Sequence, residues 1–138
     1  MNDMKYAVIC VDDDPFILQM LAFQLNKIIE HKSTLLECYS DPTKVLESID
    51  ELVENDISVL TIVVDYQMPK INGAELVRSI KSKYPHIKCV MLSGQANDLI
   101  VNELADGDFL EKFISKPWDE EKLYQTIRPI LENLGNSN

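Results

Sequence analysis

The sequence contains no uninterrupted apolar stretch close to the roughly 20 residues that a membrane-spanning helix needs. Its first residues, MNDMKYAVIC, also lack the basic segment and the long apolar segment of a secretory signal peptide. We therefore expect a cytoplasmic protein that does not contact a membrane. A chain of 138 residues, 46% of them hydrophobic, can bury one core but hardly two, so we expect one domain over residues 1–134 and a frayed tail over 135–138.

Cysteine and basic residues are also scarce. The three cysteines, Cys10, Cys38 and Cys89, lie far apart among apolar residues and offer neither a disulfide framework nor a metal-binding CxxC pattern, so we expect buried thiols. The 13 Lys and Arg residues are outnumbered by 23 Asp and Glu, which gives a formal net charge of −10 without any basic cluster. Because this charge repels a polyphosphate backbone, we expect no direct binding of nucleic acid.

Short apolar runs rich in β-branched residues alternate with segments of helical period. Two of these runs end in aspartate, Tyr6–Val11 before Asp12 and Leu60–Val64 before Asp65. Further runs of this kind are Leu35–Tyr39, Ile87–Leu92 and Phe113–Ser115. Five strands that alternate with helices predict an α/β fold with a parallel sheet and helices on both of its faces.

Each segment between the strands has one apolar helical face. Asp41 followed by Pro42 is typical of a helix start, and we expect the second helix to begin there. Pro129 lies inside the last helical segment, so we expect a kink or break near Arg128. The inward residues predicted for the five helices are Ile17, Met20, Leu21, Leu25 and Ile28; Val45, Ile49, Leu52 and Val53; Val77, Ile80 and Tyr84; Leu99, Ile100 and Leu104; and Leu123, Ile127, Ile130 and Leu134.

Polar side chains follow four of the five predicted strands. Asp12 and Asp13 follow the first, Asp65 the third, Ser93 the fourth and Lys116 the fifth. Ligands of such a sheet bind beyond the carboxyl ends of its strands, where these residues converge. One carboxylate pair about 4 Å apart repels by about 4 kcal/mol at an effective dielectric of about 20, and one lysine cannot neutralise three carboxylates. Mg²⁺, which prefers oxygen ligands and accompanies phosphoryl groups, would balance them.

This arrangement has a chemical consequence. With Mg²⁺ on one phosphoryl oxygen, Lys116 on a second and the Ser93 hydroxyl on a third, the charge that develops during transfer is neutralised. Asp65 is then left as the nucleophile. The product would be an aspartyl phosphate.

The same residues resemble the receiver domains of two-component response regulators. The resemblance spans about residues 5–130, and its four motifs occur in the family's order. It implies a flavodoxin-like, doubly wound α/β fold with strand order 2-1-3-4-5. The motifs are Val11-Asp12-Asp13, Val64-Asp65-Tyr66-Gln67-Met68-Pro69, Leu92-Ser93-Gly94 and Ser115-Lys116-Pro117.

The resemblance also implies roles for single residues. Asp65 would accept a phosphoryl group from the phosphohistidine of a sensor histidine kinase or a phosphotransfer protein, and Lys116 and Ser93 would bind the phosphoryl oxygens. Asp13, Asp65 and the backbone carbonyl of Gln67 would ligate Mg²⁺, whereas Asp12 would act mainly through a metal-bound water. We further expect the Gln67 side chain to orient or obstruct the water that hydrolyses the phosphoryl group.

A conformational switch is implied as well. Ser93 would move toward the phosphoryl group and Phe113 would turn inward, which alters the face built by helix four, strand five and helix five. That face would control a downstream protein target, with the protein a monomer or a phosphorylation-promoted dimer. Such a protein is a signalling switch that catalyses only its own phosphorylation and dephosphorylation. Lys116-Pro117-Trp118 resembles receivers of multidomain regulators and hybrid kinases, so a stand-alone protein and a domain of a larger regulator both stay open.

Two other classes of protein fit part of the pattern. In a haloacid-dehalogenase-like phosphatase, Asp12-x-Asp14 would supply the nucleophile and the acid, but Pro15 replaces an expected small polar residue and Asp65 has no role. A flavodoxin-like cofactor binder would need a hydroxyl- or glycine-rich phosphate loop after the first strand, which is absent.

Finally, we expect Gly73, which follows the Asp65 motif, to permit a backbone conformation that other residues resist.

Overall fold

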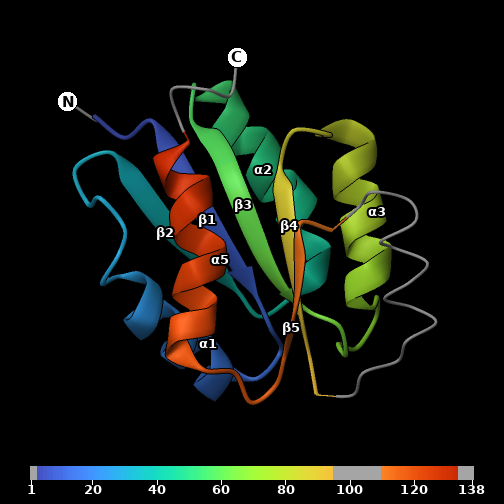
Figure 1. Ribbon diagram of the computed structural model, residues 1–138. Helices are drawn as coiled ribbons and strands as arrows, with labels where there is room; N and C mark the ends of the chain where they lie inside the picture. The colour runs from blue at the N-terminus through green and yellow to red at the C-terminus, as the bar shows by residue number, and fades with distance from the viewer. Residues whose placement is uncertain (1–2, 95–109, 134–138) are drawn as a thin grey trace.

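The structure, a computed structural model, describes residues 3–94 and 110–133. Five parallel strands form one sheet in the order β2-β1-β3-β4-β5, as predicted (Figure 1). The strands are β1 (Tyr6–Val11), β2 (Thr34–Tyr39), β3 (Ser58–Asp65), β4 (Lys88–Ser93) and β5 (Lys112–Ser115). The helices are α1 (Pro15–Leu25), the 3-10 helix η1 (Pro42–Lys44), α2 (Val45–Glu54), α3 (Gly73–Lys83) and α5 (Glu120–Glu132).

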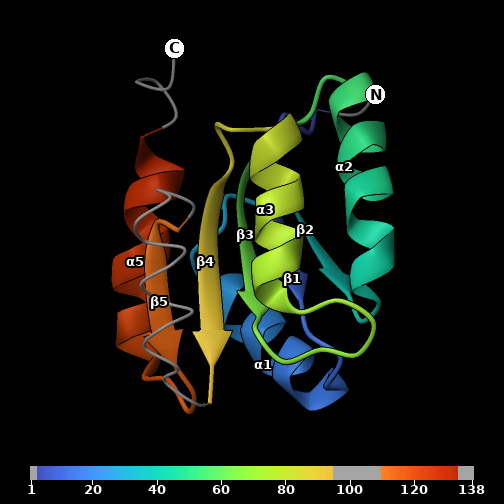
Figure 2. The same ribbon diagram turned by 90° about the vertical axis from the view of Figure 1, so that its right-hand side faces the viewer.

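The sheet is covered on both faces (Figures 1 and 2). Helices α1 and α5 lie on one face, where Val8 and Cys10 of β1 join a buried cluster with Leu21 and Leu123. Helices α2 and α3 lie on the other face, where Ile9 belongs to a second buried cluster. Because β1 lies between two strands and is covered by helices on both faces, its side chains from Ala7 to Val11 are fully buried, as its continuous apolar run indicates.

Three predictions of burial are wrong. Met20 of α1 and Val53 of α2 are 49% and 41% exposed, although both were expected to face inward. Helix α1 is apolar almost all round, so its periodicity does not decide which side meets the sheet. Cys38 is exposed as well, while Cys10 and Cys89 are buried, because Cys38 lies near the end of the edge strand β2.

Of the kink or break expected near Arg128, the break is wrong, since α5 continues through Pro129 to Glu132. Pro129 stands in the last turn of the helix, where only one hydrogen bond is lost. The turn is closed by the amide of Asn133, which donates to the Pro129 carbonyl at 3.1 Å. The predicted inward residues Leu99, Ile100, Leu104 and Leu134 lie outside the described residues.

Aspartate side chains fix the starts of two helical segments. The Asp14 carboxylate accepts from the Phe16 amide at 2.9 Å at the start of α1. Asp41 accepts from the Thr43 amide at 3.0 Å, so a helical segment does begin at Pro42, as a 3-10 turn that precedes α2.

Within the described part of the chain, no helix combines the length and the apolar character that crossing a membrane requires.

Candidate functional site

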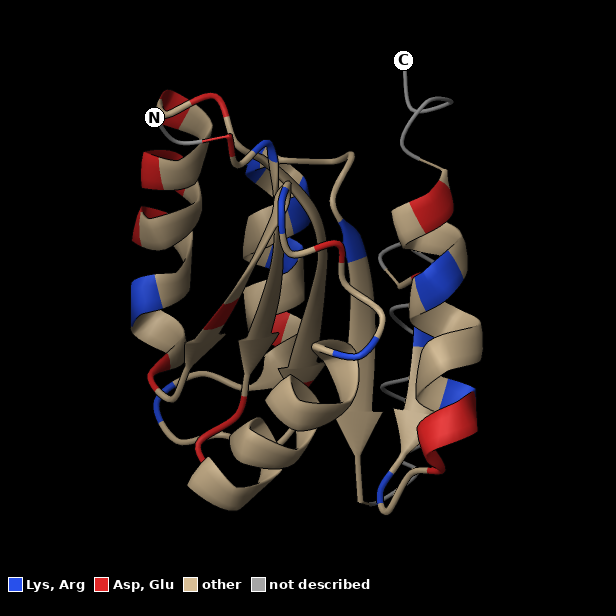
Figure 3. Ribbon diagram, turned by 90° about the vertical axis from the view of Figure 1, so that its left-hand side faces the viewer, with Lys and Arg blue, Asp and Glu red and all other residues tan. Residues whose placement is uncertain are grey.

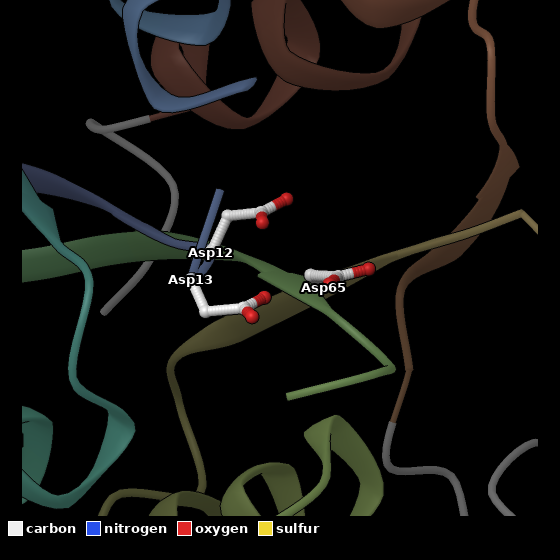
Figure 4. A group of neighbouring side chains, drawn as sticks. All are labelled: Asp12, Asp13 and Asp65. Carbon is white, nitrogen blue, oxygen red and sulfur yellow. The ribbon is translucent and has the colours of Figure 1, made fainter. Parts of the chain in front are cut away.

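Three carboxylates meet at the carboxyl ends of β1 and β3, which are neighbours in the sheet (Figure 4). Asp12 and Asp13 directly follow β1, and Asp65 is the last residue of β3. One oxygen of each carboxylate lies within 4.8 Å of an oxygen of the other two. Asp12 is 1% exposed and Asp65 is 5% exposed, whereas Asp13 opens to solvent. Oxygen donors in such a group suit Mg²⁺ or Ca²⁺, which are hard cations.

Lys116 bridges two of these carboxylates. Its ammonium lies 2.9 Å from Oδ2 of Asp12 and 2.9 Å from Oδ1 of Asp65. The Lys116 side chain is 19% exposed, so these ion pairs are partly shielded from water. The structure therefore brings together four of the residues that the strand ends single out.

The segment that carries Lys116 is held on both sides. The Lys116 amide donates to the carbonyl of Ser93 at 2.8 Å, which joins the ends of β5 and β4. Two residues further on, the indole N–H of Trp118 donates to the side-chain oxygen of Gln24 on α1 at 2.7 Å. Trp118 also packs against the cluster beneath α1 and α5. The Lys116 backbone is thereby fixed relative to both the sheet and α1.

The site carries an excess of negative charge. Burial raises the pKa of Asp65, and the charges of Asp12 and Asp13 raise it further, against the opposing effect of Lys116. Burial alone would lower the pKa of Lys116, but its hydrogen bonds to Asp65 and Asp12 outweigh this and raise the pKa. Because the pKa values of Asp65 and Lys116 are both raised, the site favours bound protons or an added cation.

Gly73, the first residue of α3, lies against the backbone of Asp65. A Cβ atom at this position would stand 2.5 Å from the carbonyl oxygen of Asp65 and 2.8 Å from Cα of Tyr66. The described glycines all have negative φ, so the expected special conformation at Gly73 is wrong. Glycine is required here for space, and the positive φ of this loop, 75°, belongs to Lys70.

The other predicted site residues, Ser93, Gln67 and Phe113, lie on β4, on the loop after β3 and on β5. Ser93 is buried at the end of β4, one residue beyond Leu92, which is the register partner of Asp65. Gln67 is exposed in the loop that follows β3. Phe113 is half-buried on β5 opposite Met91 and packs against the cluster on the α2 and α3 side. Phe113 is thus not one of the groups that contact the carboxylates.

Sequence reasoning missed the outer face of α1. Its 11 residues include no charged side chain, and the helix is tan throughout in Figure 3. Phe16 and Phe23 are 76% and 66% exposed, on the same side as the exposed Met20. A pocket of about 270 Å³ joins this face to the candidate site, and its lining residues are Ile17, Met20, Lys116, Pro117 and Trp118. The spacing of Phe16, Met20 and Phe23 is the signal that could have revealed this face.

Comparison with known proteins gives a consistent result. The family described as response regulator receiver domain matches residues 8–128. The hydrogenase transcriptional regulatory protein HoxA of Cupriavidus necator is 28% identical over 98% of this chain and 26% of its own length. The response regulator protein TodT of Pseudomonas putida is 25% identical over 96% of this chain and 54% of its own length. The chain thus spans about half or less of these two curated relatives.

One solved structure matches this chain over nearly the whole length of both. The crystal structure of a response regulator receiver domain protein from Clostridium thermocellum superposes with a TM-score of 0.77 and 25% sequence identity. The superposition covers 95% of this chain and 98% of that one. The agreement therefore holds for the complete fold of that protein.

Proposed function

The chain belongs to the response regulator receiver domain family, and on this basis we propose that it accepts a phosphoryl group on Asp65 in a Mg²⁺-dependent reaction. Members of this family are phospho-accepting signalling switches of two-component systems and are not enzymes in the usual sense. The observation that carries the proposal is the group formed by Asp12, Asp13 and Asp65, of which Asp12 and Asp65 pair with the Lys116 ammonium. Autodephosphorylation is part of the same proposal.

The donor set fits Mg²⁺ because all three side chains offer carboxylate oxygens within reach of one ion. We assign the ion to Asp13, Asp65 and the backbone carbonyl of Gln67, with Asp12 reached through water. When bound, Mg²⁺ supplies positive charge to the carboxylates and to one phosphoryl oxygen. The Gln67 side chain is exposed, which leaves it free to orient or obstruct an attacking water.

The chain's own groups then perform the transfer. A carboxylate oxygen of Asp65 attacks phosphorus, a new O–P bond forms, and the P–N bond to the donor histidine breaks. Lys116 exchanges its contact with Asp65 for a phosphoryl oxygen, which keeps its ammonium beside developing negative charge. The Ser93 hydroxyl, at the end of the neighbouring strand, donates to another phosphoryl oxygen.

The geometry disfavours Asp12 and Asp14 as the nucleophile and acid of a haloacid-dehalogenase-like phosphatase. Both oxygens of Asp12 are engaged, Oδ1 by the Asp14 amide at 2.8 Å and Oδ2 by Lys116 at 2.9 Å. Asp14 caps α1 through the Phe16 amide instead of pointing to the other carboxylates. Asp65, in contrast, meets Lys116 with Oδ1 and lies beside Asp13.

We propose that the phosphodonor, a histidine kinase or phosphotransfer protein, docks on the uncharged outer face of α1. This face begins directly after Asp14 and reaches Lys116 through the pocket beside Trp118. The exposed aromatic rings favour binding of a partner protein, and the net charge of −10 disfavours binding of nucleic acid. A partner bound there would hold its phosphohistidine close to Asp65.

The output would pass through the edge of the sheet that β5 forms, next to α5. We propose that phosphorylation draws Ser93 toward the phosphoryl group and turns Phe113 inward. Phe113 lines a groove of about 940 Å³ beside α5, so a change in its rotamer alters a surface that a downstream protein can contact. The added charge, about −2, biases these two arrangements through differential contacts.

Incubation with acetyl phosphate and Mg²⁺, followed by intact-mass measurement, tests the proposed function. We expect a single added phosphoryl group that disappears when EDTA is present and in Asp65→Asn. Asp14→Asn is the matched control, because its carboxylate only caps a helix. Steady release of phosphate that depends on Asp12 and persists in Asp65→Asn would instead identify a phosphatase.

A further inference from the structure

Two of the three cysteines are neighbours across the sheet. Cys10 of β1 and Cys38 of β2 are register partners in adjacent parallel strands (Figure 1). Neighbouring strands lie about 4.7–4.9 Å apart. Disulfides join residues whose Cα atoms are about 4.4–6.8 Å apart, so this spacing permits a bond without strand separation.

Both side chains point to the same face of the sheet. Register partners in parallel strands share a face, and Cys10 belongs to the cluster beneath α1 and α5. Leu36, two residues before Cys38, packs against the same cluster. The two thiols also affect each other's pKa, which is raised for Cys10 and lowered for Cys38. The pair therefore has the proximity and the orientation that a covalent bond needs.

The two thiols differ in their access to solvent. Cys10 is fully buried, whereas Cys38 is exposed at the edge of the sheet. The neighbouring Cys10 thiol lowers the pKa of Cys38, which increases its thiolate fraction at neutral pH. Cys89, in contrast, is buried, and burial raises its pKa to about 12, so it stays inert.

We propose that Cys38 and Cys10 form a peroxide-sensitive pair in which Cys38 reacts with hydrogen peroxide and Cys10 resolves the product as an intramolecular disulfide. In the first step the Cys38 thiolate attacks one peroxide oxygen, an S–O bond forms, and the O–O bond breaks to release hydroxide, which takes up a proton. In the second step the Cys10 sulfur attacks the Cys38 sulfur, and the S–O bond breaks. The Cys10 proton leaves with that oxygen as water. Two thiols are oxidised by two electrons, and one peroxide is reduced to two waters.

Peptide mapping of the reduced full-length chain after peroxide treatment tests this pair. Trypsin places each cysteine on its own peptide, residues 6–27 for Cys10, 33–44 for Cys38 and 89–112 for Cys89. We expect peptides 6–27 and 33–44 to be joined within one molecule and to separate on reduction with dithiothreitol. Cys89→Ala, the matched control, should give the same link.

Two further variants separate the roles of the pair. Cys38→Ser should leave Cys10 reduced, because the buried thiol does not meet the oxidant. Cys10→Ala should leave Cys38 as a sulfenic acid that dimedone traps. The proposal is overturned if peroxide joins Cys38 to Cys38 of a second molecule, or if Cys38 proceeds to sulfinic acid while Cys10 stays open to alkylation. It is equally overturned if Cys38 fails to react with peroxide in the wild-type chain.

Discussion

The Lys116 ammonium lies 2.9 Å from Oδ1 of Asp65 while it also holds Oδ2 of Asp12 at 2.9 Å. One cation is thus shared by two buried carboxylates, and Asp13 adds a third negative charge beside them. The arrangement lowers the stability of the isolated fold, because ionised Asp65 is both desolvated and repelled. The same excess of negative charge favours the divalent cation that the proposed function requires.

Asp65→Asn should stabilise the protein at neutral pH in the absence of Mg²⁺. The substitution removes the buried charge but keeps a side-chain oxygen that Lys116 can donate to. We expect a higher urea midpoint than that of the wild type at pH 7. Added Mg²⁺ should narrow the gap, because the ion binds the native wild type and stabilises it by mass action.

The same pair of proteins gives a pH test with a defined sign. Because the folded-state pKa of Asp65 is raised, the native state holds this proton more tightly than the unfolded chain, whose pKa is about 3.9. The stability of the wild type relative to Asp65→Asn is therefore greatest below that pH and falls as pH rises through the raised pKa. Urea midpoints that stay equal from pH 4 to pH 7 would contradict the raised pKa.

Lys116→Met should destabilise the protein without Mg²⁺ by about 2 kcal/mol, because two buried carboxylates lose the cation that they share. Lys88→Met is the matched control. Its partner Glu111 is 3.8 Å away and both side chains are exposed, so we expect a change within about 0.5 kcal/mol. Urea denaturation at pH 7 measures both. Equal losses in the two variants would show that the Lys116 pairs contribute no more than a surface pair.

Gly73→Ala should damage both the fold and the site. The new Cβ would stand 2.5 Å from the Asp65 carbonyl oxygen, so α3 or the end of β3 has to move, at an expense of about 1–3 kcal/mol. Acetyl phosphate labelling of Asp65 should slow in parallel. In the control Gly94→Ala, the nearest atom to the new Cβ is Cβ of Lys116 at 4.0 Å, an ordinary contact. A Gly73→Ala protein as stable and as reactive as this control would refute the spatial argument.

The α1 face is tested by the double substitution Phe16→Ser with Phe23→Ser. Burying one phenylalanine contributes about 1.5–3 kcal/mol, so the loss of two should slow transfer from a phosphorylated histidine phosphotransfer protein at least about tenfold. Acetyl phosphate needs no docking, and labelling by it should not change. Val53→Ser is the control, since Val53 is exposed on α2 away from this face. An equal slowing with both donors would place the defect in the site itself.

Much of this fold could be predicted because its three inner strands, β1, β3 and β4, are short, apolar and buried on both faces. The run from Tyr6 to Val11 shows this directly, and the order of the five strands is confirmed. The carboxyl ends of parallel strands share one edge, so the approach of Asp12, Asp13, Asp65 and Lys116 also follows from the alternation of elements. Their roles in phosphoryl transfer stay predictions.

The features that could not be predicted depend on neighbours distant in sequence. Cys38 lies in an apolar run like that of Cys10, and only its place on the edge strand exposes it. Met20 lies on a helix that is apolar almost all round, so burial was decided by which side meets the sheet. The need for glycine at position 73 arises from the carbonyl of Asp65, eight residues earlier, and not from its own φ.

The most direct test of the account is chemical identification of the phosphorylated side chain. Borohydride reduces an acyl phosphate to an alcohol, so a chain treated with acetyl phosphate and Mg²⁺ and then reduced should contain homoserine in place of Asp65. Omission of Mg²⁺ should abolish this product. Homoserine at position 12, or at position 65 to the same extent without any divalent cation, would contradict the site described above.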